Sequence, residues 1–159
     1  MISTLGTINN RQILYIDVVD HPDINKISHL ENWILFIIEN NVDNPVLRPF
    51  LELCIDRDVL YVCTAGAAGS EVDDLADLLM VIRKLKGKYL PSWLKSDDDV
   101  LMTTWHDDFE EGFWFAAQVA RYEDHPIQNV LVANLSRQTQ LNRIQGLIKR
   151  INEGWLPPD

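Results

Sequence analysis

The chain has 159 residues, of which 47% are hydrophobic and 24% are charged, values typical of one folded globular domain rather than a disordered segment. The formal net charge of −10 argues against a protein that binds nucleic acid or an anionic membrane surface. No apolar run approaches the ~20 residues that a membrane-spanning helix needs. We therefore expect a single domain spanning residues 1–159.

Short apolar runs alternate with longer amphipathic segments, which predicts a mostly parallel β-sheet with helices on both faces. Strands are expected, in chain order, at residues 12–16, 33–38, 59–63, 100–105 and 130–135. Helices are expected at residues 44–57, 70–85, 109–122 and 138–152. The connection between the first two strands is short for a helix. If none forms there, we expect the first strand to pair antiparallel at an edge of the sheet.

Residues at the expected helix ends predict specific caps. Ser70, Asp108 and Ser136 stand where helices begin and can accept hydrogen bonds from free backbone N–H groups. Gly87 follows a basic segment, which is typical of a C-terminal cap.

The two cysteines, Cys54 and Cys63, lie on apolar elements, so we expect reduced, buried thiols rather than a disulfide. The N-terminal residues lack the basic region and cleavage site of a secretory signal. Both observations predict a cytoplasmic protein.

The segment after the fourth strand has the residues best suited to catalysis. Ligands of open α/β sheets bind beyond the carboxyl ends of the strands, and there His106 stands beside Asp107. A histidine next to a carboxylate can act as a general base, and Asp17, after the first strand, could join them. His106, Asp107 and Asp17 are therefore the candidate catalytic residues. The alternative is structural: Asp108 caps a helix, Trp105 belongs to the core and His106 covers the sheet edge.

Three other segments follow strands. Residues 64–70 are small, but they contain neither the lysine of a P-loop nor a G-x-G-x-x-G motif, so we expect a tight turn. The acidic residues and histidine at 17–23 could join His106 in a Mg²⁺ or Mn²⁺ site, but their spacing does not require one. We expect no metal and no cofactor. In the segment 134–137, Arg137 is a single cation placed to meet an anion.

Two short motifs resemble those of a known family. The sequences Y-V-C at 61–63 and T-T-W-H-D at 103–107 are similar to strand ends in a family of small, uncharacterised bacterial α/β proteins. The resemblance covers roughly residues 33–117. It implies a Rossmann-like three-layer α/β/α sandwich with about five strands, and it draws attention to His106.

The charge distribution favours a binding protein over an enzyme. Nearly all of the acidic excess lies in residues 1–80, so we expect the protein to bind a basic protein partner, as a bacterial immunity protein or antitoxin does. The expected contacts are Asp56, Asp58, Asp73, Asp74, Asp77, Asp97, Asp98 and Asp99. One alternative is a small hydrolase or nucleotide-acting enzyme that uses His106. Another is a structural subunit whose five tryptophans form contact surfaces.

Overall fold

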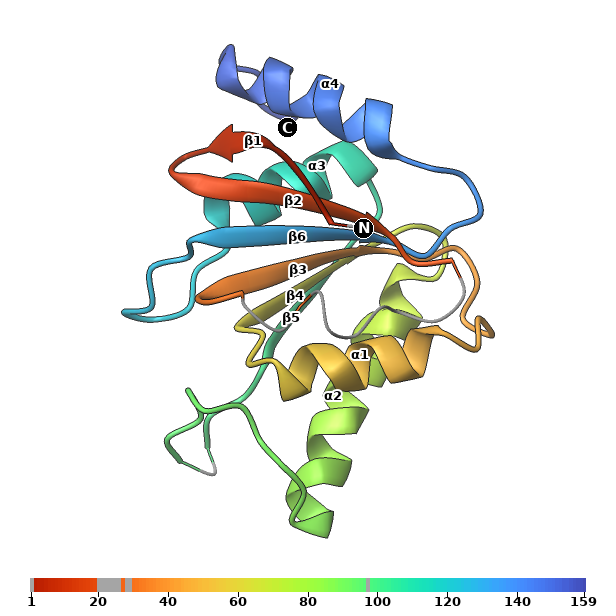
Figure 1. Ribbon diagram of the computed structural model, residues 1–159, viewed down its shortest axis with the longest axis vertical. Coiled ribbons are helices and arrows are strands. Elements are labelled where there is room, and N and C mark those ends of the chain that lie inside the picture. The colour runs from red at the N-terminus through yellow and green to blue at the C-terminus, as the bar shows by residue number, and fades with distance from the viewer. Residues whose placement is uncertain (1, 20–26, 28–29, 97) are drawn as a thin grey trace.

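The computed structural model describes residues 2–19, 27, 30–96 and 98–159. In this part of the chain, a mostly parallel sheet of six strands forms the centre of an α/β fold (Figure 1). The strands are, in sheet order, β1 (Ser3–Ile8), β2 (Arg11–Asp17), β6 (Asn129–Asn134), β3 (Trp33–Ile38), β4 (Tyr61–Ala65) and β5 (Met102–His106). Only β1 is antiparallel to its neighbour.

Helices cover both faces of the sheet (Figure 1). The helices are α1 (Leu47–Asp56), α2 (Gly69–Lys86), α3 (Phe109–Trp114), which continues into the π-helix η2 (Phe115–Val119), and α4 (Leu141–Asn152). Tyr61 and Thr64 point to opposite faces, because side chains alternate along a strand. Tyr61 packs against Phe115 of η2, whereas the Thr64 hydroxyl donates to the Gly69 carbonyl of α2 at 2.7 Å.

Strand β3 is the most deeply buried strand, and none of its residues is more than 2% exposed. A parallel strand covered on both faces must be apolar at each position, which explains its W-I-L-F-I-I sequence. Its Phe36 ring lies between Phe109 and Phe113, with ring centres 5.6 and 5.7 Å away. Cys54 and Cys63 are also buried and free, as expected, and burial raises the pKa of Cys63 to about 12.

The N-terminal edge differs from the expectation. Residues 3–8 form a strand that the sequence analysis missed, joined to β2 by a tight turn in which Asn9 and Asn10 both have positive φ. The first expected strand, β2, is parallel to β6, and the antiparallel edge is β1. The connection at 20–26 lies outside the described residues.

Two expected helix ends are confirmed. Asp108 caps α3, because its side chain accepts a hydrogen bond from the Glu111 N–H at 2.8 Å. Gly87 ends α2 in the left-handed conformation, with φ of 63°. The third helix, however, ends at Val119 rather than at residue 122.

Two expected caps are wrong, because the helices begin at other residues. Helix α2 begins after Ala68, and the Ser70 hydroxyl donates instead to the Glu71 carboxylate. Helix α4 begins after Gln140. Ser136 lies before it and donates to Asn134 at 2.6 Å.

A buried arginine closes the end of η2. Arg11 is 6% exposed, and its guanidinium donates to the carbonyls of Ala116 and Ala120 at 2.8 and 2.7 Å. Burial and the nearby charge of Arg121 lower its pKa. The cation therefore occupies the negative end of the helix, where backbone carbonyls lack partners within the helix.

No helix in the described ranges could cross a bilayer; even α2, with 18 residues, carries charged side chains along its length.

Candidate functional site

The carboxyl ends of β3 and β6 mark the point where the connections leave the sheet in opposite directions. After β3 the chain enters α1 on one face, and after β6 it leads to α4 on the other (Figure 1). Ligands of open α/β sheets bind at such a switch point. A crevice of about 600 Å³ opens there. This switch-point crevice is lined by Val18, Val19, Glu39, Asn40, Asn41, Asn44, Pro45, Leu135, Ser136, Arg137, Gln138 and Gln140.

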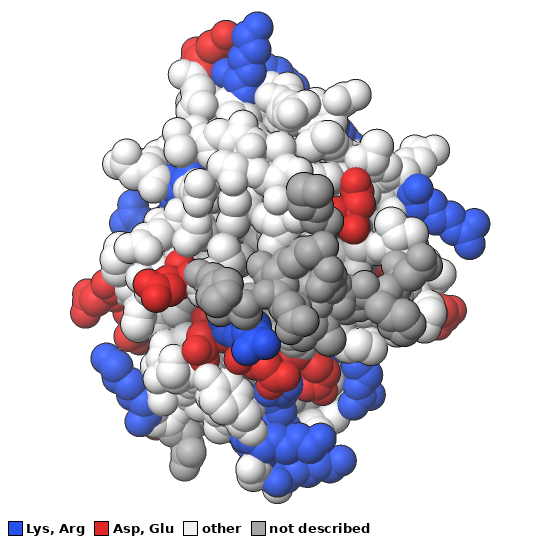
Figure 2. Space-filling model, viewed as in Figure 1, with Lys and Arg blue, Asp and Glu red and all other residues white. Residues whose placement is uncertain are grey.

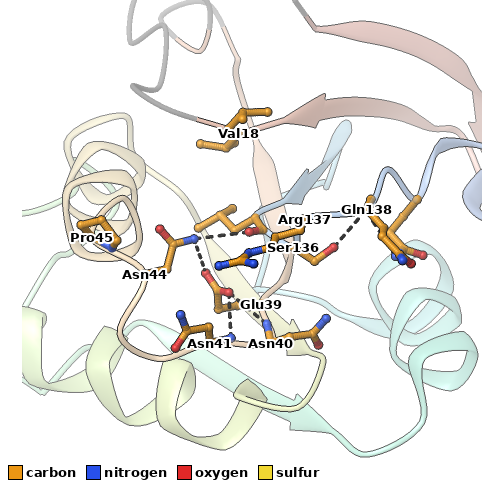
Figure 3. A pocket seen from close by; sticks show the side chains of 12 residues that line it. Val18, Glu39, Asn40, Asn41, Asn44, Pro45, Ser136, Arg137 and Gln138 are labelled. Atoms are coloured by element: carbon orange, nitrogen blue, oxygen red, sulfur yellow. Dashed lines mark hydrogen bonds between the residues drawn. The ribbon is translucent and has the colours of Figure 1, made fainter.

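A buried carboxylate lies at the bottom of this crevice. Glu39 directly follows β3 and is 1% exposed. One of its oxygens accepts hydrogen bonds from the backbone N–H groups of Asn40 and Asn41, at 3.0 and 2.9 Å, and the other accepts from the Asn44 amide at 3.0 Å (Figure 3). Burial raises the pKa of Glu39, and these three donors act in the opposite direction.

The asparagines beside Glu39 present hydrogen-bond donors to the crevice. The side-chain oxygen of Asn40 accepts from the Ala67 N–H at 3.0 Å, and that of Asn41 accepts from the Asp43 N–H at 3.1 Å. Because both oxygens are engaged, the two amide nitrogens are the groups left for a ligand. Among the described residues, neither nitrogen has an acceptor.

Arg137 brings a positive charge to the same crevice from the β6 side. Its side chain is exposed and extends toward Glu39 and the asparagines (Figure 3). It forms no ion pair with any residue that the structure describes. The sequence analysis expects Arg137 in a position where it can meet an anion, and the residue lines the switch-point crevice.

A second crevice of about 350 Å³ continues along the same edge and shares Asn40 and Gln140 with the first. It contains a second arginine, Arg143, whose guanidinium lies 3.9 Å from the centre of the Phe109 ring. Asp107 also lines this second crevice. The carboxyl edge of an acidic protein thus carries two arginines.

The His106 side chain lies between β5 and α3, where its ring is held by hydrogen bonds and by packing. Its Nδ1 lies 2.8 Å from the Glu111 carboxylate and its Nε2 lies 3.0 Å from the Thr104 hydroxyl. The ring also packs against Phe115, and its side chain is only 9% exposed. Both ring nitrogens therefore have partners within the protein, and the carboxylate that meets His106 belongs to Glu111 rather than Asp107.

The structure does not bring the three candidate catalytic residues together. Asp17 ends β2, whereas His106 ends β5, and β6, β3 and β4 lie between those strands. Four inter-strand spacings separate the two residues by on the order of 20 Å. The Asp17 carboxylate accepts hydrogen bonds from three side chains: Tyr15 at 2.6 Å, Asn134 at 2.8 Å and Thr139 at 3.1 Å.

Replacing His106 is therefore expected to change stability. His106→Ala removes a buried ring and leaves Glu111 without its partner, which should cost about 2 kcal/mol of unfolding free energy. Asp107→Asn, at an exposed position next to it, should stay within about 0.5 kcal/mol of the wild type. Urea denaturation of both variants measures the difference. Equal stabilities would contradict this structural role.

Several of the expected partner-binding carboxylates are engaged within the chain. Asp58 accepts from the Tyr89 hydroxyl at 2.6 Å, and Asp56 lies 2.7 Å from the Arg83 guanidinium. Asp99 accepts from two backbone N–H groups in its own turn. Asp97 lies outside the described residues, and Asp98 is exposed.

The other three expected contacts, Asp73, Asp74 and Asp77, lie together on α2. Asp77 faces β5 and accepts from the Thr103 hydroxyl at 3.1 Å. On the face drawn in Figure 2, acidic side chains of the described residues are interspersed with basic ones rather than merged into one acidic surface. Of the expected contacts that the structure describes, Asp56, Asp58 and Asp99 are thus engaged with groups of the chain itself, whereas Asp73, Asp74 and Asp77 are grouped on α2.

The metal hypothesis concerned residues at 17–23 together with His106. Most of that segment, including Asp20, His21 and Asp23, lies outside the described residues. Within the described part of the chain, no three histidine, cysteine or acidic side chains are grouped so as to hold a metal ion.

Sequence reasoning missed Glu39, Asn40, Asn41 and Asn44. Their signal was available, because a charged residue and three asparagines follow the most apolar strand of the chain. The sequence analysis predicts only that a helix follows, at residues 44–57.

Sheet order and helix placement define this chain as an α/β domain. It belongs to the family described as Domain of unknown function (DUF7684), whose model matches residues 13–151. The resemblance to a family without an assigned function is thereby confirmed. No curated protein matches the chain.

Proposed function

We propose that this protein binds a small anionic molecule in the switch-point crevice. The observation that carries the proposal is that three side chains with hydrogen-bond donors line one crevice: Asn40 and Asn41 on either side of Glu39, and the Arg137 guanidinium (Figure 3). A carboxylate or phosphate group accepts hydrogen bonds from donors of this kind, and a hydrogen bond to a charged partner is stronger than one between neutral groups.

The size and lining of the crevice suit such a ligand. A volume of about 600 Å³ lies within the range of small-molecule sites, and most of the lining side chains are polar. The Glu39 carboxylate is held in place by three N–H groups, from the backbone of Asn40 and Asn41 and from the Asn44 amide. We infer that Glu39 positions Asn40 and Asn41 for binding.

We also assign the fold to the Rossmann-like three-layer α/β/α class. The order β5-β4-β3-β6 corresponds to the order 3-2-1-4 found in Rossmann folds. In that class, the crevice between the strands equivalent to β3 and β6 is the expected ligand site. The assignment and the proposed ligand site therefore support each other.

Isothermal titration calorimetry with inorganic phosphate, citrate and AMP tests the proposal. We expect at least one of these probes to bind the wild type, and Arg137→Gln to weaken binding by at least about tenfold. Arg121→Gln removes the same charge from an exposed position outside the crevice and should leave the affinity unchanged. The proposal is overturned if no probe binds, or if the two variants bind equally well.

Other functions stay predictions. A hydrolase or nucleotide-acting enzyme built on His106 would need a free ring nitrogen, and both nitrogens already have partners. The prediction of a cytoplasmic location rests on the two cysteines and the N-terminal residues, and that of an immunity-type activity rests on the uneven charge of the sequence.

A further inference from the structure

Strand β5 is the outermost strand at one end of the sheet. Among the described residues, no strand pairs with its outer side, so backbone N–H and C=O groups there lack a neighbouring strand. Exposed edges usually carry lysine, proline or a bulge, which prevent another strand from adding. The β5 sequence, M-T-T-W-H, contains neither lysine nor proline.

Apolar side chains surround this edge. A groove of about 390 Å³ runs between α2 and β5 and is lined by Met80, Val81, Val100, Leu101 and Met102 together with polar side chains. Val81 is 52% exposed and Val100 is 58% exposed. Trp105, on β5 beyond the groove, is 50% exposed. Single exposed apolar residues are common, but a continuous apolar groove beside an open edge is typical of an interaction surface.

One end of the groove is acidic. Asp77 lines it, and Asp73 and Asp74 lie one turn earlier on α2. Burial raises the pKa of Asp73, and the nearby negative charges of Asp77 and Asp74 act in the same direction. One Asp73 oxygen is buried without a hydrogen-bond partner among the described residues. Lys84 borders the other end, where it donates to the Asp99 carbonyl at 3.0 Å.

We propose that the β5 edge binds an extended, basic segment of another protein, which joins the sheet as an additional strand. Backbone hydrogen bonds to β5 supply affinity, as in other cases of strand addition. Alternate apolar side chains of the partner enter the groove beside Val81 and Met102. Its lysines or arginines meet Asp74 and Asp77, which relieves the repulsion within the acidic cluster.

A second copy of this chain fits the same edge less well. In a symmetric dimer formed through β5, the two α2 helices would lie side by side and bring two sets of Asp74 and Asp77 together. Like charges placed across an interface oppose binding. Charge complementarity therefore selects a basic partner, independently of any ligand in the switch-point crevice.

Panning phage-displayed random peptides on the full-length protein tests the proposal. We expect enriched peptides to alternate apolar and basic residues. A synthetic peptide of the most enriched sequence should bind Asp74→Asn/Asp77→Asn about tenfold more weakly than the wild type, with a further loss at high salt. The control is Glu153→Gln/Asp159→Asn, which removes the same charge from exposed positions elsewhere and should bind as the wild type does.

Three outcomes would overturn the proposal. One is enrichment of peptides with no basic residues, or no enrichment at all. Another is equal loss of affinity in both charge variants. The third is a stable dimer in analytical ultracentrifugation that Trp105→Lys dissociates, because the edge would then be occupied by a second copy. Circular dichroism of each variant shows whether it remains folded.

Discussion

Gly66→Ala is expected to cost at least about 3 kcal/mol of unfolding free energy, among the largest losses for a single added methyl group. Gly66 follows β4 with φ of +99°, a conformation that a residue with a side chain rarely adopts. An added Cβ would also lie 2.4 Å from the Glu39 carbonyl oxygen and 2.8 Å from the Asn40 side-chain oxygen. The backbone of one loop or the other would have to move.

A second glycine supplies the matched control. Gly146 lies on the exposed side of α4, and an added Cβ would meet no atom within 4 Å. Gly146→Ala should therefore stabilise the protein by about 0.5–1 kcal/mol, through higher helix propensity. Urea denaturation of the two variants measures both effects. The close approach of the two loops would be contradicted if the unfolding free energy of Gly66→Ala lay within about 1 kcal/mol of the wild-type value.

Arg11→Met is expected to cost about 3 kcal/mol, because two buried carbonyls at the end of η2 lose a charged donor. Methionine keeps much of the volume of the arginine stem, so the substitution removes mainly the guanidinium. Burial of an uncharged side chain recovers part of the free energy that is lost with the guanidinium, so the net cost stays at about 3 kcal/mol. Thermal unfolding followed by circular dichroism provides the measurement.

Arg150→Met is the matched comparison at the surface. Arg150 is exposed and meets Glu110 at 3.3 Å, and exposed pairs of this kind contribute at most about 1 kcal/mol. Arg11→Met should therefore lower the unfolding temperature several times more than Arg150→Met. Similar losses in the two variants would show that the guanidinium of Arg11 is not needed to close the helix.

The central strands could be predicted because burial on both faces demands an unbroken apolar run. The strand at 33–38 was predicted with the bounds that the structure has, and the next strand was displaced by two residues. Strand β1 was missed because most of its residues are exposed or half-buried, so no apolar pattern marks it. Its turn residues, Asn9 and Asn10, were the available signal.

The candidate site could be predicted only in part. The sequence analysis pointed to the carboxyl edge of the sheet and to Arg137, because strand ends in this fold class are known places for ligands. It did not find Glu39, because the hydrogen bonds that hold its carboxylate come from the loop that follows β3 and form only in the folded chain. It also chose Asp107 as the partner of His106, whereas the helical turn after Asp108 brings Glu111 to the ring.

The order of the strands has a consequence for biosynthesis. Strand β6 lies between β2 and β3, yet it is the last strand of the sheet to leave the ribosome. Because proteins are made from the N-terminus, residues 129–134 are synthesised after β2 and β3. Until they emerge, the edge of β2 and the edge of β3 that pair with β6 have no neighbouring strand. Pairing across such long sequence separations slows folding and exposes apolar edges meanwhile. Newly made chains are therefore expected to depend on chaperones more than a domain with sequential strands would.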